Sequence, residues 1–70
     1  MKNSIKIERA ILGITQEELA LKIGVSRQTI SSIEKNRYIP STLLALRLSQ
    51  LFTKPVNTFF ELEQEDEVLI

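Results

Sequence analysis

The chain of 70 residues contains no cysteine and no histidine. These absences exclude a disulfide-stapled scaffold, a zinc site of the Cys/His kind, a thiol nucleophile and an imidazole base. No apolar run approaches the roughly 20 residues that a membrane-spanning helix needs. The first residues lead into a charged, periodic segment that does not resemble a signal peptide, so a cytoplasmic location and no membrane partner are expected.

Catalytic signals are also lacking. Isolated acids and hydroxyls occur, but they form no acid cluster, activated nucleophile or Gly-rich phosphate loop. An enzyme is therefore not expected, and no cofactor, metal ion or small-molecule ligand is indicated. A chain this short forms one domain and buries only about 60% of the surface of its unfolded form. Packing or oligomerisation must offset this small size.

The net charge of the whole chain is zero, but its basic and acidic residues are unevenly distributed. The chain has nine basic and nine acidic residues, and every basic residue lies at or before Lys54. Residues 1–60 contain four acids and carry a net charge of +5, whereas the last ten residues contain five acids and no base. Residues 1–60 are thus basic and residues 61–70 form an acidic tail. This distribution is compatible with a polyanion such as nucleic acid as a partner of the basic part. An ordinary solvated tail is the alternative interpretation.

Apolar residues recur at spacings of three and four before residue 60, which predicts an all-α body. The expected helices cover residues 4–12, 16–23, 27–35, 42–53 and 56–60. Asn3 or Ser4 can cap the first helix, and Gly13 and Gly24 follow the first two helices where a left-handed residue commonly ends a helix. Ser41 is the expected cap of the fourth helix.

The stretch of residues 15–36 carries the sharpest local signals. Residues 15–18 form a capping box, in which the Thr15 hydroxyl accepts the Glu18 amide and the Glu18 carboxylate accepts the Thr15 amide. Only two residues, beginning with Gly24, separate the helix that follows from Ser26, the expected cap of the next one. Two short helices joined by a tight glycine turn form a helix-turn-helix.

The helix of residues 27–35 has two chemically distinct sides. At about 100° per residue, its inner side carries Ile30, Ile33 and Glu34, and its outer side carries Gln28, Ser31, Ser32 and Lys35. The outer donors and acceptors suit the major groove of DNA, where Gln28 can bond adenine and Arg27 can bond guanine, each pair giving about 1 to 3 kcal/mol of discrimination. For a helix seen in isolation, an ordinary solvated face is the alternative.

Several motifs occur together: Arg9, Gly13, TQEELA at 15–20, GVSRQTI at 24–30, Ile33 with Glu34, and Pro40 with Ser41. Over about residues 5–60 this combination resembles the Cro and phage-repressor (XRE) family of helix-turn-helix regulators, especially its short single-domain members from bacteria or phages. The resemblance implies a compact bundle of four to five helices over residues 1–60, with the third helix in the major groove of double-stranded DNA. One departure is Ile7-Glu8, where many relatives have a polar residue followed by an apolar one.

The resemblance assigns roles to matching positions. Base reading is expected from Arg27, Gln28, Thr29 and Ser32. Contacts to the DNA backbone are expected from Gln16, Ser26, Ser31, Lys35, Asn36, Arg37, Tyr38 and Ser41. At the start of the second helix, Gln16 is expected to hold a phosphate and to buttress Gln28. Arg9 and Glu34 are expected to form a structural ion pair between the first and third helices.

Relatives of this kind are typically dimers joined through the carboxyl-terminal end. The matching apolar set consists of Leu46, Val56, Phe59, Phe60 and Leu62, with packing inside the monomer as the alternative. The termini of such relatives sometimes pair as a small sheet at the dimer end, and residues 1–3 and 61–63 could pair in this way. For residues 68–70 the sequence leaves open disorder or a contribution to the dimer. The acidic tail should lie away from the DNA.

The leading interpretation is a homodimeric transcriptional regulator, expected to be a repressor, that binds a palindromic operator with half-sites roughly 34 Å apart. In the cell it would be associated with the nucleoid when bound. An antitoxin-like or other protein-interaction module, in which DNA binding is secondary, is the alternative. Because no separate sensor domain is implied, a protein inducer or antirepressor is the expected source of induction.

Overall fold

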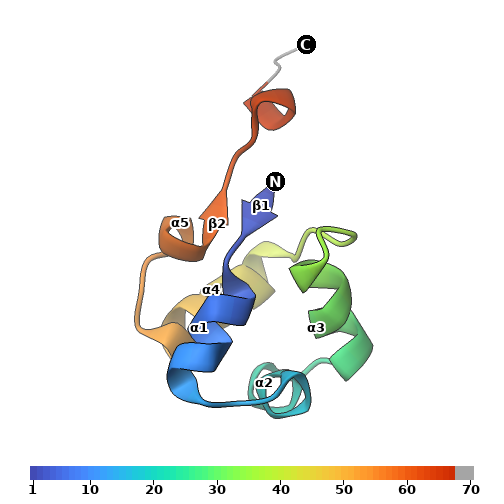
Figure 1. Ribbon diagram of the computed structural model, residues 1–70, viewed down its shortest axis with the longest axis vertical. Helices are drawn as coiled ribbons and strands as arrows, with labels where there is room; N and C mark the ends of the chain where they lie inside the picture. The colour runs from blue at the N-terminus through green and yellow to red at the C-terminus, as the bar shows by residue number, and fades with distance from the viewer. Residues whose placement is uncertain (68–70) are drawn as a thin grey trace.

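The computed structural model describes residues 1–67, and these residues form five α-helices, two short strands and one 3₁₀ helix (Figure 1). In chain order the elements are β1 (Lys2–Asn3), α1 (Ile5–Leu12), α2 (Gln16–Ile23), α3 (Arg27–Glu34), α4 (Thr42–Phe52), α5 (Val56–Phe59), β2 (Phe60–Glu61) and η1 (Gln64–Glu67). The predicted helices are confirmed to within one residue at each end. The helical bundle with a small terminal sheet is confirmed as well.

Hydrogen bonds at the caps explain where the helices begin. The Thr15 hydroxyl accepts the Glu18 amide at 3.0 Å, and the Glu18 carboxylate accepts the Thr15 amide at 2.9 Å, so the predicted capping box is present. Hydrogen bonding by Thr15 to the Glu18 carboxyl group, first of all from the Thr15 backbone amide, lowers the pKa of that group. The hydroxyls of Ser26 and Ser41 cap α3 and α4 in the same manner. Each start is therefore determined within one helical turn.

Two glycines end α1 and α2. Gly13 has a φ of 68° and Gly24 a φ of 78°, which is the left-handed backbone conformation that residues other than glycine rarely adopt. The turn at Gly24 is also crowded, because a Cβ atom there would lie 3.3 Å from Nη1 of Arg47. The tight turn between α2 and α3 thus needs glycine for its backbone conformation and tolerates little added bulk.

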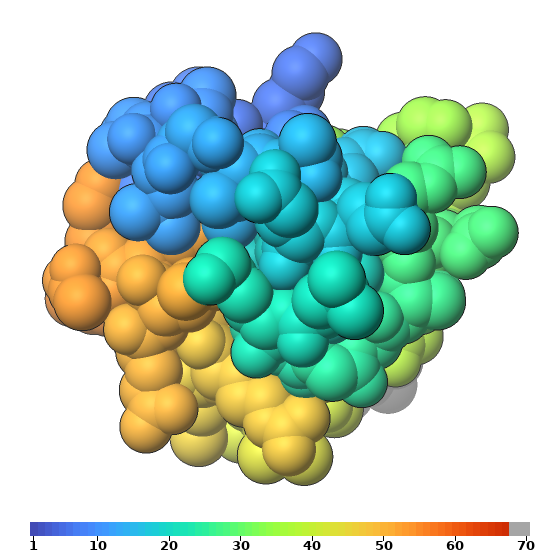
Figure 2. Space-filling model, turned by 90° about the horizontal axis from the view of Figure 1, so that it is seen from below, coloured from blue at the N-terminus to red at the C-terminus, as the bar shows by residue number. Residues whose placement is uncertain are grey.

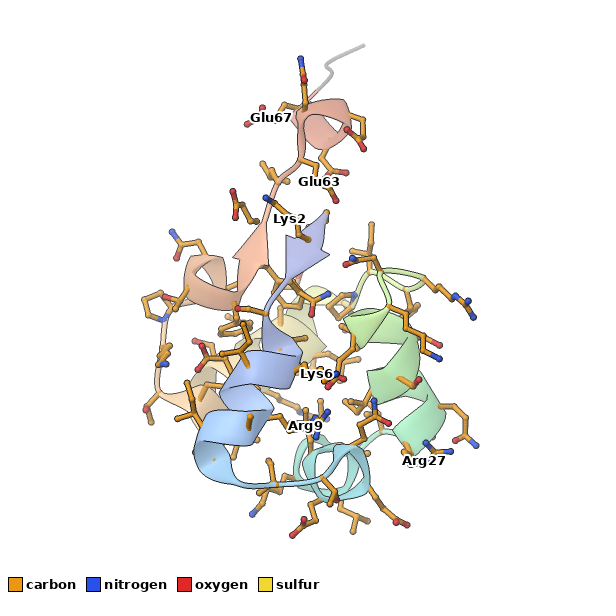
Figure 3. The ribbon with its side chains drawn as sticks, in the orientation of Figure 1. Lys2, Lys6, Arg9, Arg27, Glu63 and Glu67 are labelled. Carbon is orange, nitrogen blue, oxygen red and sulfur yellow. The ribbon has the colours of Figure 1, made fainter. Side chains whose placement is uncertain are left out.

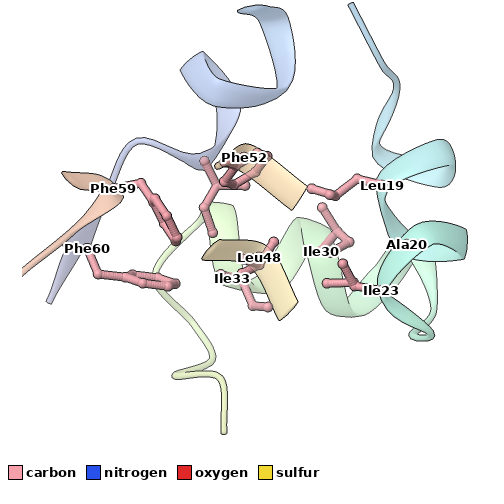
Figure 4. Packing of buried hydrophobic residues seen from close by; sticks show 10 residues of the cluster. Leu19, Ala20, Ile23, Ile30, Ile33, Leu48, Phe52, Phe59 and Phe60 are labelled. Atoms are coloured by element: carbon pink, nitrogen blue, oxygen red, sulfur yellow. The ribbon is translucent and has the colours of Figure 1, made fainter. Parts of the chain in front are cut away.

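One apolar core receives side chains from every α-helix (Figure 4). Its buried members are Ile5, Leu19, Ala20, Ile23, Ile30, Ile33, Leu48, Phe52, Phe59 and Phe60. The rings of Phe52 and Phe59 meet edge to face, with 5.1 Å between centroids and 85° between planes. Phe59 is only 1% exposed, so its assignment to a dimer interface is wrong: its ring fills the interior of its own chain. Phe60 is also buried, with 8% of its surface exposed.

The terminal sheet joins the two ends of the described chain. β1 and β2 run antiparallel, with Lys2 opposite Glu61 and Asn3 opposite Phe60. Pairing of the termini is thus confirmed, although the second strand begins one residue earlier than residues 61–63. Because Phe60 and Glu61 are in the sheet, the folded domain continues into the first residue of the acidic tail.

Tail residues 62–67 lie at the end of the molecule opposite α2 (Figure 1). There the amino group of Met1 lies 2.7 Å from Oδ2 of Asp66 and 3.2 Å from Oε1 of Glu63. The bond to the Met1 amino group is the main reason why the pKa of Asp66 is lowered. The two alternatives for residues 68–70 lie outside the described residues. In the part of the chain that the structure describes, no helix is long and apolar enough to cross a membrane.

α1 contains a buried acid that apolar spacing does not predict. Glu8 is 6% exposed, whereas its neighbour Ile7 is 61% exposed. Nζ of Lys54, which follows α4, lies 2.7 Å from Oε1 of Glu8. A buried carboxylate requires such a partner. The Ile7-Glu8 departure from the family pattern therefore corresponds to an inward-facing ion pair and an outward-facing isoleucine.

Candidate nucleic-acid interface

The side chains predicted to contact DNA gather on α3 and the loop after it. Arg27 and Gln28 are exposed at the start of α3, beside half-buried Thr29 and Ser32. Seen from the α2 end, α2 and α3 form one continuous surface (Figure 2). A shallow open groove on α3 and its loop is lined by Gln28, Thr29, Ser32, Arg37 and Tyr38. The structure thus places three predicted base-reading residues beside two predicted backbone contacts.

The loop after α3 begins with a sharp change of direction at Asn36. Its φ is 60°, and asparagine is one of the few residues besides glycine that adopt this left-handed conformation. The Asn36 amide donates to the Ile33 carbonyl at 3.0 Å, and the Arg37 amide donates to the Ser32 carbonyl at 2.8 Å. These bonds close the end of α3 and leave the side chains on both sides of Asn36, those of Lys35 and Arg37, exposed.

An ion pair joins α1 to α3 behind this surface. Nε and Nη2 of Arg9 lie 2.9 and 3.2 Å from the two carboxylate oxygens of Glu34, whose side chain is 7% exposed. Arg9 also donates to the Ile14 carbonyl at 3.1 Å. The hydrogen bond with Glu34 raises the pKa of Arg9. In Figure 3, Arg9 points into the space between α1, α2 and α3, whereas Arg27 projects outward.

Gln16 extends this ion pair toward the surface. Its Nε2 donates to Oε1 of Glu34 at 3.1 Å, and its Oε1 lies 3.5 Å from Nη1 of Arg27. The expectation that Gln16 buttresses Gln28 is therefore corrected, because both polar atoms of its amide have other partners. The angular positions within α3 cannot show which residue a side chain of α2 meets. The Gln16 side chain thus connects Arg27 to the ion pair of Arg9 and Glu34.

The predicted serine contacts have different surroundings. Ser26 and Ser41 are exposed, and each already accepts the amide bond that caps a helix. Ser26 also lies 3.0 Å from the hydroxyl of Thr29. Ser31 is half-buried and does not line the groove with Gln28. Within residues 1–67, no group of acidic side chains is arranged to hold a metal ion.

A second surface lies on α4 and α5. It is an apolar groove, here called the α4–α5 groove, lined by Met1, Ile39, Pro40, Thr42, Ala45, Leu46, Val56 and Phe60. Three of the five predicted interface residues, Leu46, Val56 and Phe60, line it. Leu62 is exposed further along the chain, Phe60 belongs to both the core and the groove wall, and Phe59 lies in the core without lining the groove. An apolar surface of this kind is typical of a site covered by another protein.

The chain is similar to known proteins over most of its length. A family described as helix-turn-helix matches residues 5–59. The chain is 46% identical over 66 residues to the HTH-type transcriptional regulator YgzD of Bacillus subtilis, and equally to one of Methanocaldococcus jannaschii; each match covers 94% of this chain and 100% of the relative. It is also 38% identical over 53 residues to the ImmF control region 10 kDa protein of Bacillus phage phi105, covering 76% of this chain and 59% of that protein. This chain belongs to the Cro and phage-repressor (XRE) family of helix-turn-helix, DNA-binding transcriptional regulators.

Proposed function

We propose that the chain binds a palindromic operator as a homodimer and represses transcription there. α3 lies in the major groove with Arg27 and Gln28 toward the base edges, and Lys35 and Arg37 contact phosphates. The observation that carries this proposal is the groove that places Gln28 and Ser32 beside Arg37 and Tyr38. One approach of the protein thus makes base and backbone contacts together. A bound dimer represses by excluding other proteins from the same stretch of DNA.

The charge distribution supports this orientation. Residues 1–60 carry the net positive charge, and Arg27, Lys35 and Arg37 are exposed on or beside α3. The acids of η1 lie at the end opposite α2 (Figure 1). Neutralising DNA phosphates releases counterions, so affinity should fall with salt by a slope of about −0.9 per phosphate contacted. The zero net charge of the chain is therefore compatible with binding to DNA.

The α4–α5 groove supports the homodimer. Its volume is about 300 Å³, and two exposed leucines, Leu43 and Leu46, lie on α4. A self-complementary contact between two copies would bury this surface around a two-fold axis. The same axis would place two copies of α3 in successive turns of one DNA face, roughly 34 Å apart.

Selection from a pool of random DNA duplexes at low salt tests the proposal. The expected result is enrichment of an inverted repeat whose half-sites lie about 10 base pairs apart. Failure to enrich any sequence would refute sequence-specific regulation. Enrichment of a single half-site alone would refute the palindromic operator. If this protein raised expression of a reporter gene that carries the selected site, repression would be refuted.

Two substitutions separate base reading from backbone contact. Gln28→Ala is expected to relax preference at one position of each half-site by about 1 to 3 kcal/mol, because it removes a bidentate base contact. Arg37→Ala is expected to weaken binding to all sequences alike, because it removes a phosphate contact. Competition titrations with singly substituted operators measure both effects. Gln50→Ala, at an exposed position of α4, is the matched control. Unchanged preference at every position in Gln28→Ala would exclude Gln28 as a base reader.

Leu46→Glu tests the homodimer. A carboxylate in the α4–α5 groove is expected to raise the dimer dissociation constant at least tenfold, about 1.4 kcal/mol, since the charge would be buried against apolar side chains. Light scattering measures the change in mass from a dimer toward one chain of 8.0 kDa. Ile11→Glu, at an exposed position of α1, is the control and should remain dimeric. A wild-type mass near one chain at high micromolar concentration would contradict the dimer.

A further inference from the structure

Asn3 connects the terminal sheet to the end of α3. Its side-chain Nδ2 donates to the Ile33 carbonyl at 2.8 Å and to Oδ1 of Asn36 at 2.9 Å. Its Oδ1 accepts the Ile5 amide at 3.2 Å. One half-buried amide therefore binds the first turn of α1, the last turn of α3 and the second residue after α3. Capping of α1 and pairing with residues 61–63, the two roles expected for Asn3, do not account for these two donated bonds.

The contact with Asn36 acts where the backbone is strained. Asn36 has a positive φ, a conformation that costs energy in residues other than glycine unless the surroundings hold it. The Asn3 side chain supplies one such hold, at 2.9 Å. Lys35 and Arg37 flank this position and are both exposed. The direction in which these two cations project therefore depends on the conformation that Asn3 stabilises.

We infer that Asn3 is a positioning residue for the DNA-backbone contacts of the loop after α3, an inference that rests on the proposed function of that loop. Asn3 lies outside the helix-turn-helix, and the amide nitrogen of its side chain donates two hydrogen bonds to other residues of the same chain. It acts through Asn36 and Ile33. Its strand partner Phe60 lines the α4–α5 groove, so β1 links that groove to the loop after α3.

Amide hydrogen exchange in the free protein tests the positioning. Asn3→Asp keeps an oxygen for the Ile5 amide but replaces both donated hydrogen bonds with an acceptor. The amides of Asn36 and Arg37 are expected to exchange about tenfold faster, the loss expected for roughly one hydrogen bond. Amides within α2 should keep their protection, which separates local loosening from global unfolding. Asn57→Asp, an exposed asparagine in α5 with the same charge change, is the control. Unchanged exchange at Asn36 and Arg37 would overturn the inference.

DNA binding by the neutral variant Asn3→Ala provides the second measurement. Affinity for the selected operator and for random DNA is expected to fall about tenfold alike, and the salt slope should decrease by about the −0.9 of one phosphate. A loss of stability alone would leave the slope unchanged. Asn57→Ala is the control, and a salt slope equal to that of the control would overturn the inference. Hydrogen exchange is measured without DNA, so it tests the positioning by Asn3 independently of DNA binding. If the wild type selects no sequence from the random duplexes, the proposed function is refuted and the exchange result still stands.

Discussion

Replacing Phe59 by alanine is expected to lower the free energy of unfolding by about 3 to 5 kcal/mol, as for other buried rings. Phe59 contacts the rings of Phe52 and Phe60 at centroid distances of 5.1 and 5.2 Å. Its loss would leave a cavity beside the rings of Phe52 and Phe60, because Phe59 is the one buried residue of the four-residue α5. A domain of this size has a thin stability margin, so the variant should be largely unfolded at physiological temperature.

Urea denaturation followed by circular dichroism measures this effect. Because dimers are stabilised by mass action, wild type and variants should be compared at several protein concentrations. Ile11→Ala is the control: Ile11 is 64% exposed on α1, outside the α4–α5 groove, and its replacement should change stability by no more than about 0.5 kcal/mol. If Phe59→Ala unfolded at the same urea concentration as the wild type but no longer self-associated, Phe59 would belong to the dimer interface.

Replacing Arg9 by methionine is expected to cost about 3 to 5 kcal/mol, the range for removing one partner of a buried ion pair. The Glu34 carboxylate would remain almost inaccessible to water, with Nε2 of Gln16 at 3.1 Å as its remaining side-chain donor. Methionine retains most of the volume of arginine, so the loss reports on the unpaired charge more than on a cavity. Thermal or urea unfolding at neutral pH measures it.

The double variant Arg9→Met/Glu34→Met provides the critical control. Removing both charges should recover most of the lost stability, since apolar replacement of a buried pair is often close to neutral. Lys2→Met breaks the exposed pair with Glu61, at 3.8 Å, and should change stability by less than about 1 kcal/mol. A double variant less stable than Arg9→Met would contradict an unpaired buried charge as the cause.

Most of the fold was predictable from the sequence because its signals act locally. The capping box at Thr15 and the left-handed glycines at positions 13 and 24 each depend on residues within one or two turns. Apolar spacing likewise assigned Ile30 and Ile33 to the inner side of α3, which the structure confirms. Such signals set helix limits and faces without reference to the rest of the chain.

The partners between elements were less predictable. Lys54 pairs with Glu8, 46 residues away, and Asn3 bonds Asn36, 33 residues away. Angular positions give the direction of a side chain within one helix but not its neighbour on another. Gln16 was therefore assigned to Gln28 rather than to Glu34 and Arg27. The same limit explains why Phe59 is predicted at the dimer interface. The spacing of apolar residues is the same whether a side chain packs into the core of its own chain or against a second copy.

The brevity of the helices has a consequence for how recognition is lost. α1, α2 and α3 each contain eight residues, fewer than the roughly 12 to 15 at which an isolated helix becomes even marginal in water. A synthetic peptide of residues 15–36 would contain the proposed base contacts in the correct order and yet present them on a disordered chain. Affinity for DNA and cooperative folding of the whole domain therefore form a single equilibrium. A substitution in the core that unfolds the domain is therefore expected to abolish DNA binding, as a substitution at the DNA surface would.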